Sequence, residues 1–268
     1  MEKIRWRGTH GVGDFMQALN VAHRYSFDHN KLPVNLEMHW EHDEDYLYHP
    51  RDPETIIERM HKIHEMYLEN NRVVVTHVYN SDMFHYEDTE QKVKNRFFFD
   101  SERYDPTGSP PNDWCFHPHE FEKPQDKIVI FTPHYNKEKP RQWKRWLTSD
   151  DWYDIIALLR WEGWILEEVT YRTPIMEAYR HIKECKFIVS YDGMWHYIGR
   201  NFCKPHLIPS KEGVTTYNTP NALKLKSRDE MMEFFVDEDD RLGKNLHRLN
   251  VPAQRLRNNL SKELGIKL

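Results

Sequence analysis

Cysteine is scarce in this sequence. The three cysteines, Cys115, Cys185 and Cys203, are too few and too scattered to build a disulfide framework or a cysteine-based zinc site. This usage fits a reducing compartment. We therefore expect a cytoplasmic protein.

Long apolar runs are also missing. Hydrophobic residues make up 38% of the chain, and no stretch approaches the roughly 18 consecutive apolar residues that a membrane span requires. The segment from Met1 to Trp6 goes directly into a strand-like pattern, without the apolar core and cleavage site of a signal peptide. The sequence thus predicts a soluble protein with no membrane span and no export signal.

The chain has no overall excess of positive charge. Its net charge of −5 argues against a protein that coats nucleic acid, although an average can hide a local patch. One such patch lies at residues 241–268, where seven Lys or Arg accompany one acid, Glu263, for a net charge of +6. Two interpretations stay open: the solvated face of a helix with leucines on its other side, or a surface for a phosphate backbone.

Strand-like and helix-like patterns alternate through the first half of the chain. The predicted elements are a strand at 3–9, a helix whose apolar stripe runs from Phe15 to Tyr25, a strand at 34–40, a helix at 53–68 and a buried strand at 73–78. These patterns indicate an α/β lobe over residues 1–120. Its last part, residues 100–124, holds five of the fifteen prolines, and we interpret it as a linker or interdomain loop.

The second half has a clearer alternation. The predicted elements are a strand at 127–131, a helix at 150–161 ended by Gly163, a strand at 164–169, a helix at 174–183, a strand at 186–190, a short helix at 195–202 and a strand at 206–208. Strands that alternate with helices of this length imply a parallel sheet wound on both faces. We expect a second lobe at residues 121–220. Residues 221–268 would form further helices, starting with a capping box at Ser227 and Glu230 and packing back across the lobes.

A glycine-rich turn joins the first strand to the first helix. Gly11 and Gly13 are small enough for a ligand to approach the backbone, and the N-terminus of the helix that follows favours anions. Asp14 lies just inside that helix. It is therefore a candidate base, and the alternative is an acid that caps the helix or compensates its dipole.

A second group of polar residues follows the strand at 127–131. Thr132 comes directly after it, and the cations Lys144 and Arg145 precede the next helix. Hydroxyls, backbone groups and cations beyond the carboxyl end of a parallel strand can form a diphosphate receptor. The alternative is a loop with basic surface residues.

The third motif spans residues 190–197, at the end of one predicted strand and the start of a helix. Gly193 permits a tight turn after Asp192, while Met194 and His196 lie in the first turn of the helix. Amides at such a helix start, together with His196, can face a phosphate or a developing negative charge.

In this order along the chain, the three motifs resemble the heptosyltransferase family of GT-B glycosyltransferases. The resemblance is more specific over residues 127–209 than over the first 25 residues. It implies an α/β fold of two Rossmann-like lobes with parallel sheets and a central cleft. It also implies a metal-independent and inverting transfer of a sugar from a nucleotide-sugar donor, with no further cofactor.

The same resemblance assigns roles to individual residues. Asp14 would be the base that takes the proton of the acceptor hydroxyl. The residues that would bind the donor are Thr132, Lys144, Arg145, Asp192, Gly193, Met194 and His196. The whole chain also resembles glycosyltransferase-like proteins of tailed phages, some of which modify hydroxymethylated cytosine in DNA. The expected acceptor is therefore modified DNA in a host cytoplasm. The alternative acceptor is a saccharide.

Histidine is abundant, and its spacing leaves another interpretation open. Pairs with two-ligand spacing occur at His39 and His42, at His61 and His64, and at His117 and His119. A metal-dependent hydrolase built on these pairs is one alternative function. A nucleotide- or nucleic-acid-binding module without turnover is the other. We expect no metal site, because the pairs lie in polar segments where surface roles are commoner.

Overall fold

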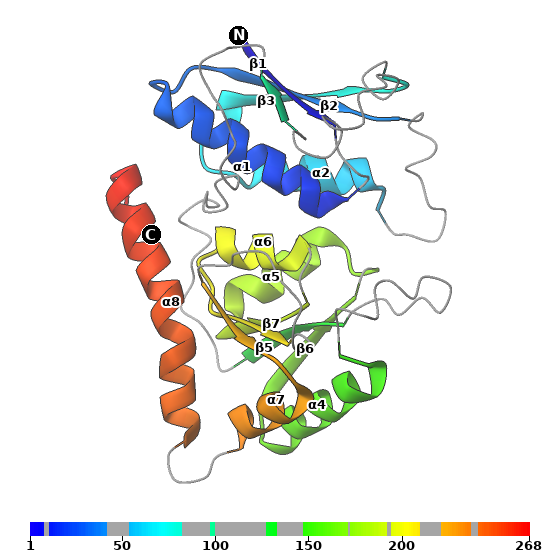
Figure 1. Cartoon of the computed structure of the whole chain (residues 1–268), viewed down its shortest axis with the longest axis vertical. Coiled ribbons are helices and arrows are strands. Elements are labelled where there is room, and N and C mark those ends of the chain that lie inside the picture. The colour runs from blue at the N-terminus through cyan, green and yellow to red at the C-terminus, as the bar shows by residue number, and fades with distance from the viewer. Residues whose placement is uncertain are drawn as a thin grey trace. The chain divides into compact units, whose positions relative to one another are not determined.

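The computed structural model of the chain describes residues 1–7, 11–41, 54–81, 97–99, 127–132, 147–170, 172–191, 194–209, 221–236 and 241–268. The chain divides into Met1–His117, called unit 1 here, and Pro118–Leu268, called unit 2. Both units contain parallel strands with helices between them, which confirms the predicted α/β class (Figure 1). In the described part of the chain, no helix is long and apolar enough to cross a membrane.

Unit 1 is built around a sheet in the order β3-β2-β1-β4. Its elements are β1 (Glu2–Arg7), α1 (Val12–Asp28), β2 (Val34–His39), α2 (Ile56–Glu65), the short 3-10 helix η2 (Asn70–Arg72), β3 (Val73–Val78) and β4 (Phe97–Phe99). β1, β2 and β3 are parallel, while β4, which the sequence did not predict, pairs with β1 in the antiparallel sense. Both crossovers move in the same direction, so α1 and α2 lie on one face of the sheet (Figure 1).

The two faces of this sheet differ because side chains alternate along each strand. Ile4 and Trp6 of β1 are buried. Lys3 and Arg5 point to the other face, where both pair with Glu37 of β2 at 2.8 and 3.1 Å. Burial raises the pKa of Glu37, but the hydrogen bonds from Lys3 and Arg5 outweigh it and the net pKa is lowered.

One prediction for unit 1 is wrong. The apolar run at 73–78 is a strand with the predicted bounds, but it is not a buried one. Val73 is buried, whereas Val74 is 45% exposed. The reason is the strand order, which places β3 beside β2 at one end of the sheet. The predicted linker at 100–124 lies outside the described residues.

Unit 2 contains a parallel sheet in the order β6-β5-β7-β8-β9. Its elements are β5 (Lys127–Phe131), α4 (Ser149–Trp161), β6 (Ile165–Val169), α5 (Ile175–Glu184), β7 (Phe187–Val189), α6 (Met194–Asn201), β8 (His206–Pro209), β9 (Ala222–Leu225), α7 (Arg228–Phe235) and α8 (Arg241–Leu264). The predicted strands and helices of residues 127–208 are all present. β9 was not predicted.

Helices cover both faces of the unit 2 sheet, as predicted. On one face, Ile128, Ile130 and Val189 belong to a core cluster with buried residues of α4, α7 and α8. On the other face, Phe131 contacts α6 through Trp195, and α5 packs along β5. Figure 1 shows α4 and α7 on one side of the strands and α5 and α6 on the other.

Two helix ends illustrate how local sequence sets these bounds. α4 ends at Trp161, two residues before Gly163, whose φ of +82° is a left-handed conformation that favours glycine. α7 begins after Ser227, whose side chain accepts a hydrogen bond from the amide of Glu230. The return contact of a capping box is missing, because the Glu230 carboxylate accepts from the amide of Lys226 instead. The helices and strand beyond residue 220 belong to unit 2.

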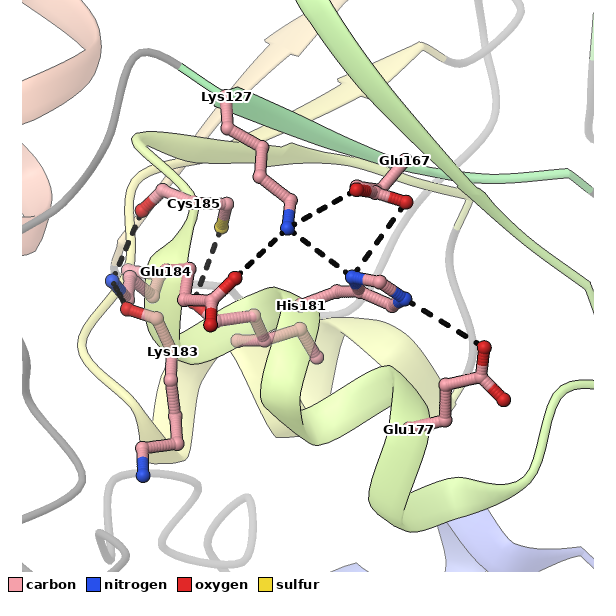
Figure 2. A network of polar contacts seen from close by, with 9 residues as sticks. Lys127, Glu167, Glu177, His181, Lys183, Glu184 and Cys185 are labelled. Carbon is pink, nitrogen blue, oxygen red and sulfur yellow. Dashed lines mark hydrogen bonds and ion pairs between the residues drawn. The ribbon is translucent and has the colours of Figure 1, made fainter.

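A polar network occupies the amino end of β5 (Figure 2). Lys127 Nζ donates to Glu184 Oε2 at 3.0 Å and lies 3.2 Å from His181 Nδ1 and 3.3 Å from Glu167 Oε1. The hydrogen bond from Lys127 lowers the pKa of Glu184. This edge of a parallel sheet lies opposite to the carboxyl edge, where ligands bind. We therefore assign the network to the stability of unit 2.

Candidate functional site

The strand order of unit 2 creates a topological switch point between β5 and β7. From β5 the chain passes through α4 to β6 on one side, and then returns through α5 to β7 on the other side. In such sheets, ligands bind outside the carboxyl ends of the strands at the point where the order reverses. Here those ends are followed by Thr132 and by Ser190, so the second and third sequence motifs begin side by side.

Thr132 continues from β5 at this point. Its amide donates to the carbonyl of Val169 at 2.9 Å, which holds its backbone beside the end of β6. Its hydroxyl is buried and makes no hydrogen bond within the described part of the chain. A buried hydroxyl that lacks a partner is costly in the free protein. The carboxyl edge of the sheet therefore has a buried hydroxyl that makes no hydrogen bond to the described residues.

Ser190 and His206 hold the start of the third motif. Ser190 Oγ lies 2.6 Å from His206 Nε2, and both residues are fully buried. Burial and then the charge of Arg200 lower the pKa of His206 to about 3, so its imidazole is neutral. Ser190 Oγ also donates to the carbonyl of Tyr191 at 3.0 Å. Both contacts of Ser190 are hydrogen bonds if His206 carries its proton on Nε2, because Ser190 Oγ then accepts from the imidazole and donates to the Tyr191 carbonyl.

Sequence reasoning missed this pair. Ser190 was part of a recognised motif, but His206 was only the start of a predicted strand. The two residues are 16 positions apart and meet because β7 and β8 are parallel neighbours. A buried serine and a histidine at a strand start carry no signal of their own in one sequence.

Trp195 connects the two carboxyl ends at the switch point. Its ring stacks on that of Phe131 with centroids 3.9 Å apart. Burial raises the pKa of Tyr191 in the preceding turn, while its hydrogen bond with Trp195 acts in the opposite direction. α6 is thereby fixed to the end of β5. Its first turn starts directly beyond β7, where a helix N-terminus favours anions.

The predicted donor residues divide into described and undescribed ones. Thr132 and Met194 lie at the switch point, and His196 lies in α6, although its side chain is outside the described atoms. Lys144, Arg145, Asp192 and Gly193 lie outside the described residues. Their predicted roles stay predictions.

Asp14 lies in the first turn of α1, where the sequence placed it. The N-cap is Gly11, with φ −108° and ψ 135°, and as a glycine it has no side chain that could cap the helix. A Cβ added to Gly11 would lie 3.4 Å from Asp14 Oδ2, so the carboxylate lies over the N-cap. Gly13 is the second residue of α1, and neither glycine has a positive φ in the described backbone. The carboxylate therefore lies at the carboxyl edge of the unit 1 sheet.

The histidine pairs do not form a metal centre in the described part of unit 1. His39 Nδ1 lies 2.7 Å from Ser81 Oγ. His61 lies against His77, whereas His64 lies near His23, so the members of this pair face different neighbours. His42, His117 and His119 lie outside the described residues. Among the residues described, no three His, Cys, Asp or Glu side chains are placed to hold a metal ion.

Two pockets of unit 2 lie away from the switch point. One of about 540 Å³ is bordered by Lys224 of β9, Glu233 of α7, and Arg241 and Arg248 of α8. Another of about 250 Å³ is lined by Lys186, Cys203 and Arg257, among others. Neither includes Thr132 or a residue of the third motif. The switch point is therefore identified from the strand order and from the Thr132 hydroxyl.

Comparisons with known proteins give a distant structural likeness. No protein-family model matches the sequence, and no curated protein matches it. One similar structure is the bacterial iron-containing dodecameric glycosyltransferase TibC from enterotoxigenic E. coli, with 11% identity, coverage of 97% of this chain and 76% of that chain, and a TM-score of 0.44. Another is the dodecameric iron-containing heptosyltransferase TibC in complex with ADP-D-beta-D-heptose, with 13% identity, coverage of 97% and 75%, and a TM-score of 0.43. At these values, the likeness establishes neither an activity nor a substrate for this chain.

Proposed function

We propose that this chain transfers a sugar from a nucleotide-sugar donor to an acceptor hydroxyl. One observation carries the proposal. The two segments that the sequence selects for donor binding follow β5 and β7, the two strands at the switch point of a parallel sheet. The described residues of these segments, Thr132 and Met194, support this location.

In this proposal, unit 2 holds the donor diphosphate. The buried hydroxyl of Thr132 donates to a phosphate oxygen, which removes its unsatisfied state. The first amides of α6, at Met194 and beyond, add donors with a favourable dipole. Lys144, Arg145 and His196 would supply charge, and the turn at Asp192 and Gly193 would place the donor. Cations and amides then stabilise the departing diphosphate without a metal ion.

Unit 1 supplies the base in the same proposal. Asp14 takes the proton of the acceptor hydroxyl as that oxygen attacks the anomeric carbon and the diphosphate leaves. A single displacement of this kind inverts the anomeric configuration. The proposed acceptor is a hydroxymethylated base in DNA. A saccharide is the second candidate, if the protein transfers no sugar to DNA.

The Thr132 hydroxyl provides the test. We expect Thr132→Val to leave the free energy of unfolding unchanged or to raise it, because an unsatisfied buried hydroxyl is removed. The same variant should bind nucleoside diphosphates about tenfold or more weakly by calorimetry, because a hydrogen bond to a charged group contributes about 1.5–3 kcal/mol. Unchanged affinity would take Thr132 out of the donor site.

Thr170 offers a matched control. It follows β6 as Thr132 follows β5, but it is exposed and its hydroxyl accepts from the amide of Arg172. Thr170→Val should not alter nucleotide affinity. A screen of nucleotide-sugars, ADP-heptose included, with mass detection on saccharide and modified-DNA acceptors then tests transfer itself. Thermal stabilisation by divalent metals instead of nucleotides would favour the hydrolase alternative.

A further inference from the structure

α8 has one face inside unit 2 and one face outside it. Leu249, Ala253, Leu256 and Leu260 are buried and recur at helical spacing along one side. The helix packs on β8, β9 and α7. The apolar stripe of α8 is therefore buried and is not available to a groove or a lipid layer.

The opposite side of α8 carries a row of cations, named the basic stripe here. It consists of Lys244, Arg248, Arg255 and Lys262, all of them exposed. Steps of four and seven residues return to nearly the same side of a helix with 3.6 residues per turn. Arg248, Arg255 and Lys262 are thus about 10.5 Å apart along the axis, at a rise of about 1.5 Å per residue.

The cations of the basic stripe differ from many others in the chain because they are not neutralised. Arg24, Lys31 and Arg160 each form an ion pair with a carboxylate. Within the ranges that the structure describes, no carboxylate pairs with a stripe residue, and Arg248 only donates to Asn245 Oδ1. Since the whole chain carries −5 and residues 241–268 carry +6, the other residues carry −11. The positive charge of the chain is thus concentrated in residues 241–268.

The structure also shows which cations of residues 241–268 lie together on one exposed side of α8. Arg257 lies only two positions beyond Arg255, but it is half-buried and lines the pocket of about 250 Å³ beside Lys186 and Cys203. The sequence alone does not separate the seven Lys and Arg of residues 241–268. The helix geometry leaves Arg257 out of the row that Arg255 forms with Arg248 and Lys262.

We propose that the basic stripe binds the phosphate backbone of a nucleic acid. A row of exposed cations complements a row of phosphates, and such binding needs charge alone. Amphipathic helices that bind membranes also insert an apolar face, and in α8 that face is already buried. The basic stripe would hold the macromolecule that carries the acceptor hydroxyl, and this role in catalysis rests on the proposed function. The binding of nucleic acid by the stripe does not depend on the proposed function.

The experiment compares two triple variants with the same change in net charge. The stripe variant is Arg248→Gln, Arg255→Gln and Lys262→Gln. The matched variant is Arg24→Gln, Lys31→Gln and Arg160→Gln, which removes three paired cations outside α8. Binding of a labelled oligonucleotide duplex is measured by fluorescence anisotropy at several salt concentrations, and thermal unfolding confirms that each variant is folded.

We expect the stripe variant to bind about tenfold or more weakly at low salt, and to flatten the slope of log affinity against log salt by about two to three units, since each neutralised phosphate contributes about 0.9. The matched variant should keep the slope of the wild-type protein. Equal effects of both variants, or no effect of the stripe variant, would overturn the proposal.

A second arm separates the two sources of phosphate. Sedimentation with phosphatidylserine vesicles tests whether the stripe binds lipid headgroups. Wild-type protein that binds these vesicles but no duplex at low salt would overturn the assignment to nucleic acid. Calorimetry with nucleoside diphosphates is the last control, because the stripe variant should bind them as the wild-type protein does. Unchanged nucleotide affinity of Thr132→Val would therefore reject the donor site, but it would not test whether the basic stripe binds nucleic acid.

Discussion

The indole of Trp195 stacks on the ring of Phe131 with centroids 3.9 Å apart, which joins α6 to the carboxyl end of β5. Both rings are buried. The contact holds the helix that would present amides to a donor against the strand that leads to Thr132. Stability and donor binding are therefore expected to depend on the same pair.

Replacing Trp195 by alanine should reduce the free energy of unfolding by about 3–5 kcal/mol, the usual cost of removing a large buried aromatic side chain. Urea denaturation followed by circular dichroism measures this, and nucleotide affinity should fall with it. Trp161 is the control, because it is 86% exposed. Trp161→Ala should change stability by no more than about 0.5 kcal/mol. Equal effects of the two substitutions would contradict the packing role of Trp195.

Lys144 and Arg145 are predicted to bind the donor phosphates. Their replacement by alanine together should weaken nucleoside diphosphate binding by about 2–4 kcal/mol, because charge-assisted hydrogen bonds contribute about 1.5–3 kcal/mol each and the pair is partly redundant. Calorimetry provides the measurement. Arg160→Ala removes another cation of unit 2, one that is paired with Glu168, and should leave the affinity unchanged. If the double variant binds like the wild-type protein, these cations are not part of the site.

Asp14 is predicted to act in the chemistry rather than in the fold. Asp14→Asn should lower turnover by about 100-fold or more by removing the base, while donor affinity stays the same. The loss of a charge at the helix start should cost only about 0.3–1 kcal/mol of stability. Asp28→Asn, at the other end of α1 and paired with Arg24, is the control and should retain activity. Full activity of the Asp14 variant would exclude it as the base.

Acid should destabilise both units. Burial lowers the pKa of His206 to about 3 and that of His77 to about 4. Unfolded histidine binds its proton near pH 6.5, so below that pH the unfolded state holds more protons than the folded state. The free energy of unfolding should fall as the pH drops from about 6.5 towards 4, and His206 alone should account for a loss on the order of 2–3 kcal/mol near pH 4.5.

Urea unfolding at neutral and acid pH tests this. His206→Asn should lower stability at neutral pH and give a flatter pH dependence than the wild-type protein. His247→Asn changes an exposed histidine of α8 and should keep the wild-type slope. An unchanged slope in the His206 variant would show that this residue does not cause the acid loss.

Local patterns were sufficient for most elements. β5 has its predicted bounds, α4 begins one residue earlier than predicted, and α5 is shifted by one residue at both ends, because their apolar residues recur with a clear period. The sequence did not distinguish a central strand from an edge strand. β3 has an apolar run like that of β5, yet Val74 is exposed and all of β5 is buried. Burial depends on neighbouring strands, which a local pattern does not contain.

In the candidate site, too, local patterns predicted the segments but not their neighbours in the fold. The residues after β5 and β7 were selected from the sequence because polar groups follow buried strands there. Their proximity depends on β6 and β7 pairing on opposite sides of β5, which is a property of the crossovers. The contact between Ser190 and His206 likewise requires β7 and β8 to be neighbours.

The sequence by itself determined the charge of α8 and its leucine period, since both follow from the order of residues. It did not determine which cations face the solvent. Arg255 and Arg257 are separated by about 200° around the helix axis, and either could have been inside. Burial of the stripe that holds Leu256 and Leu260 leaves Arg255 exposed and Arg257 half-buried. Which of the two arginines is exposed therefore depends on the tertiary structure, because an apolar stripe is buried only where another surface covers it.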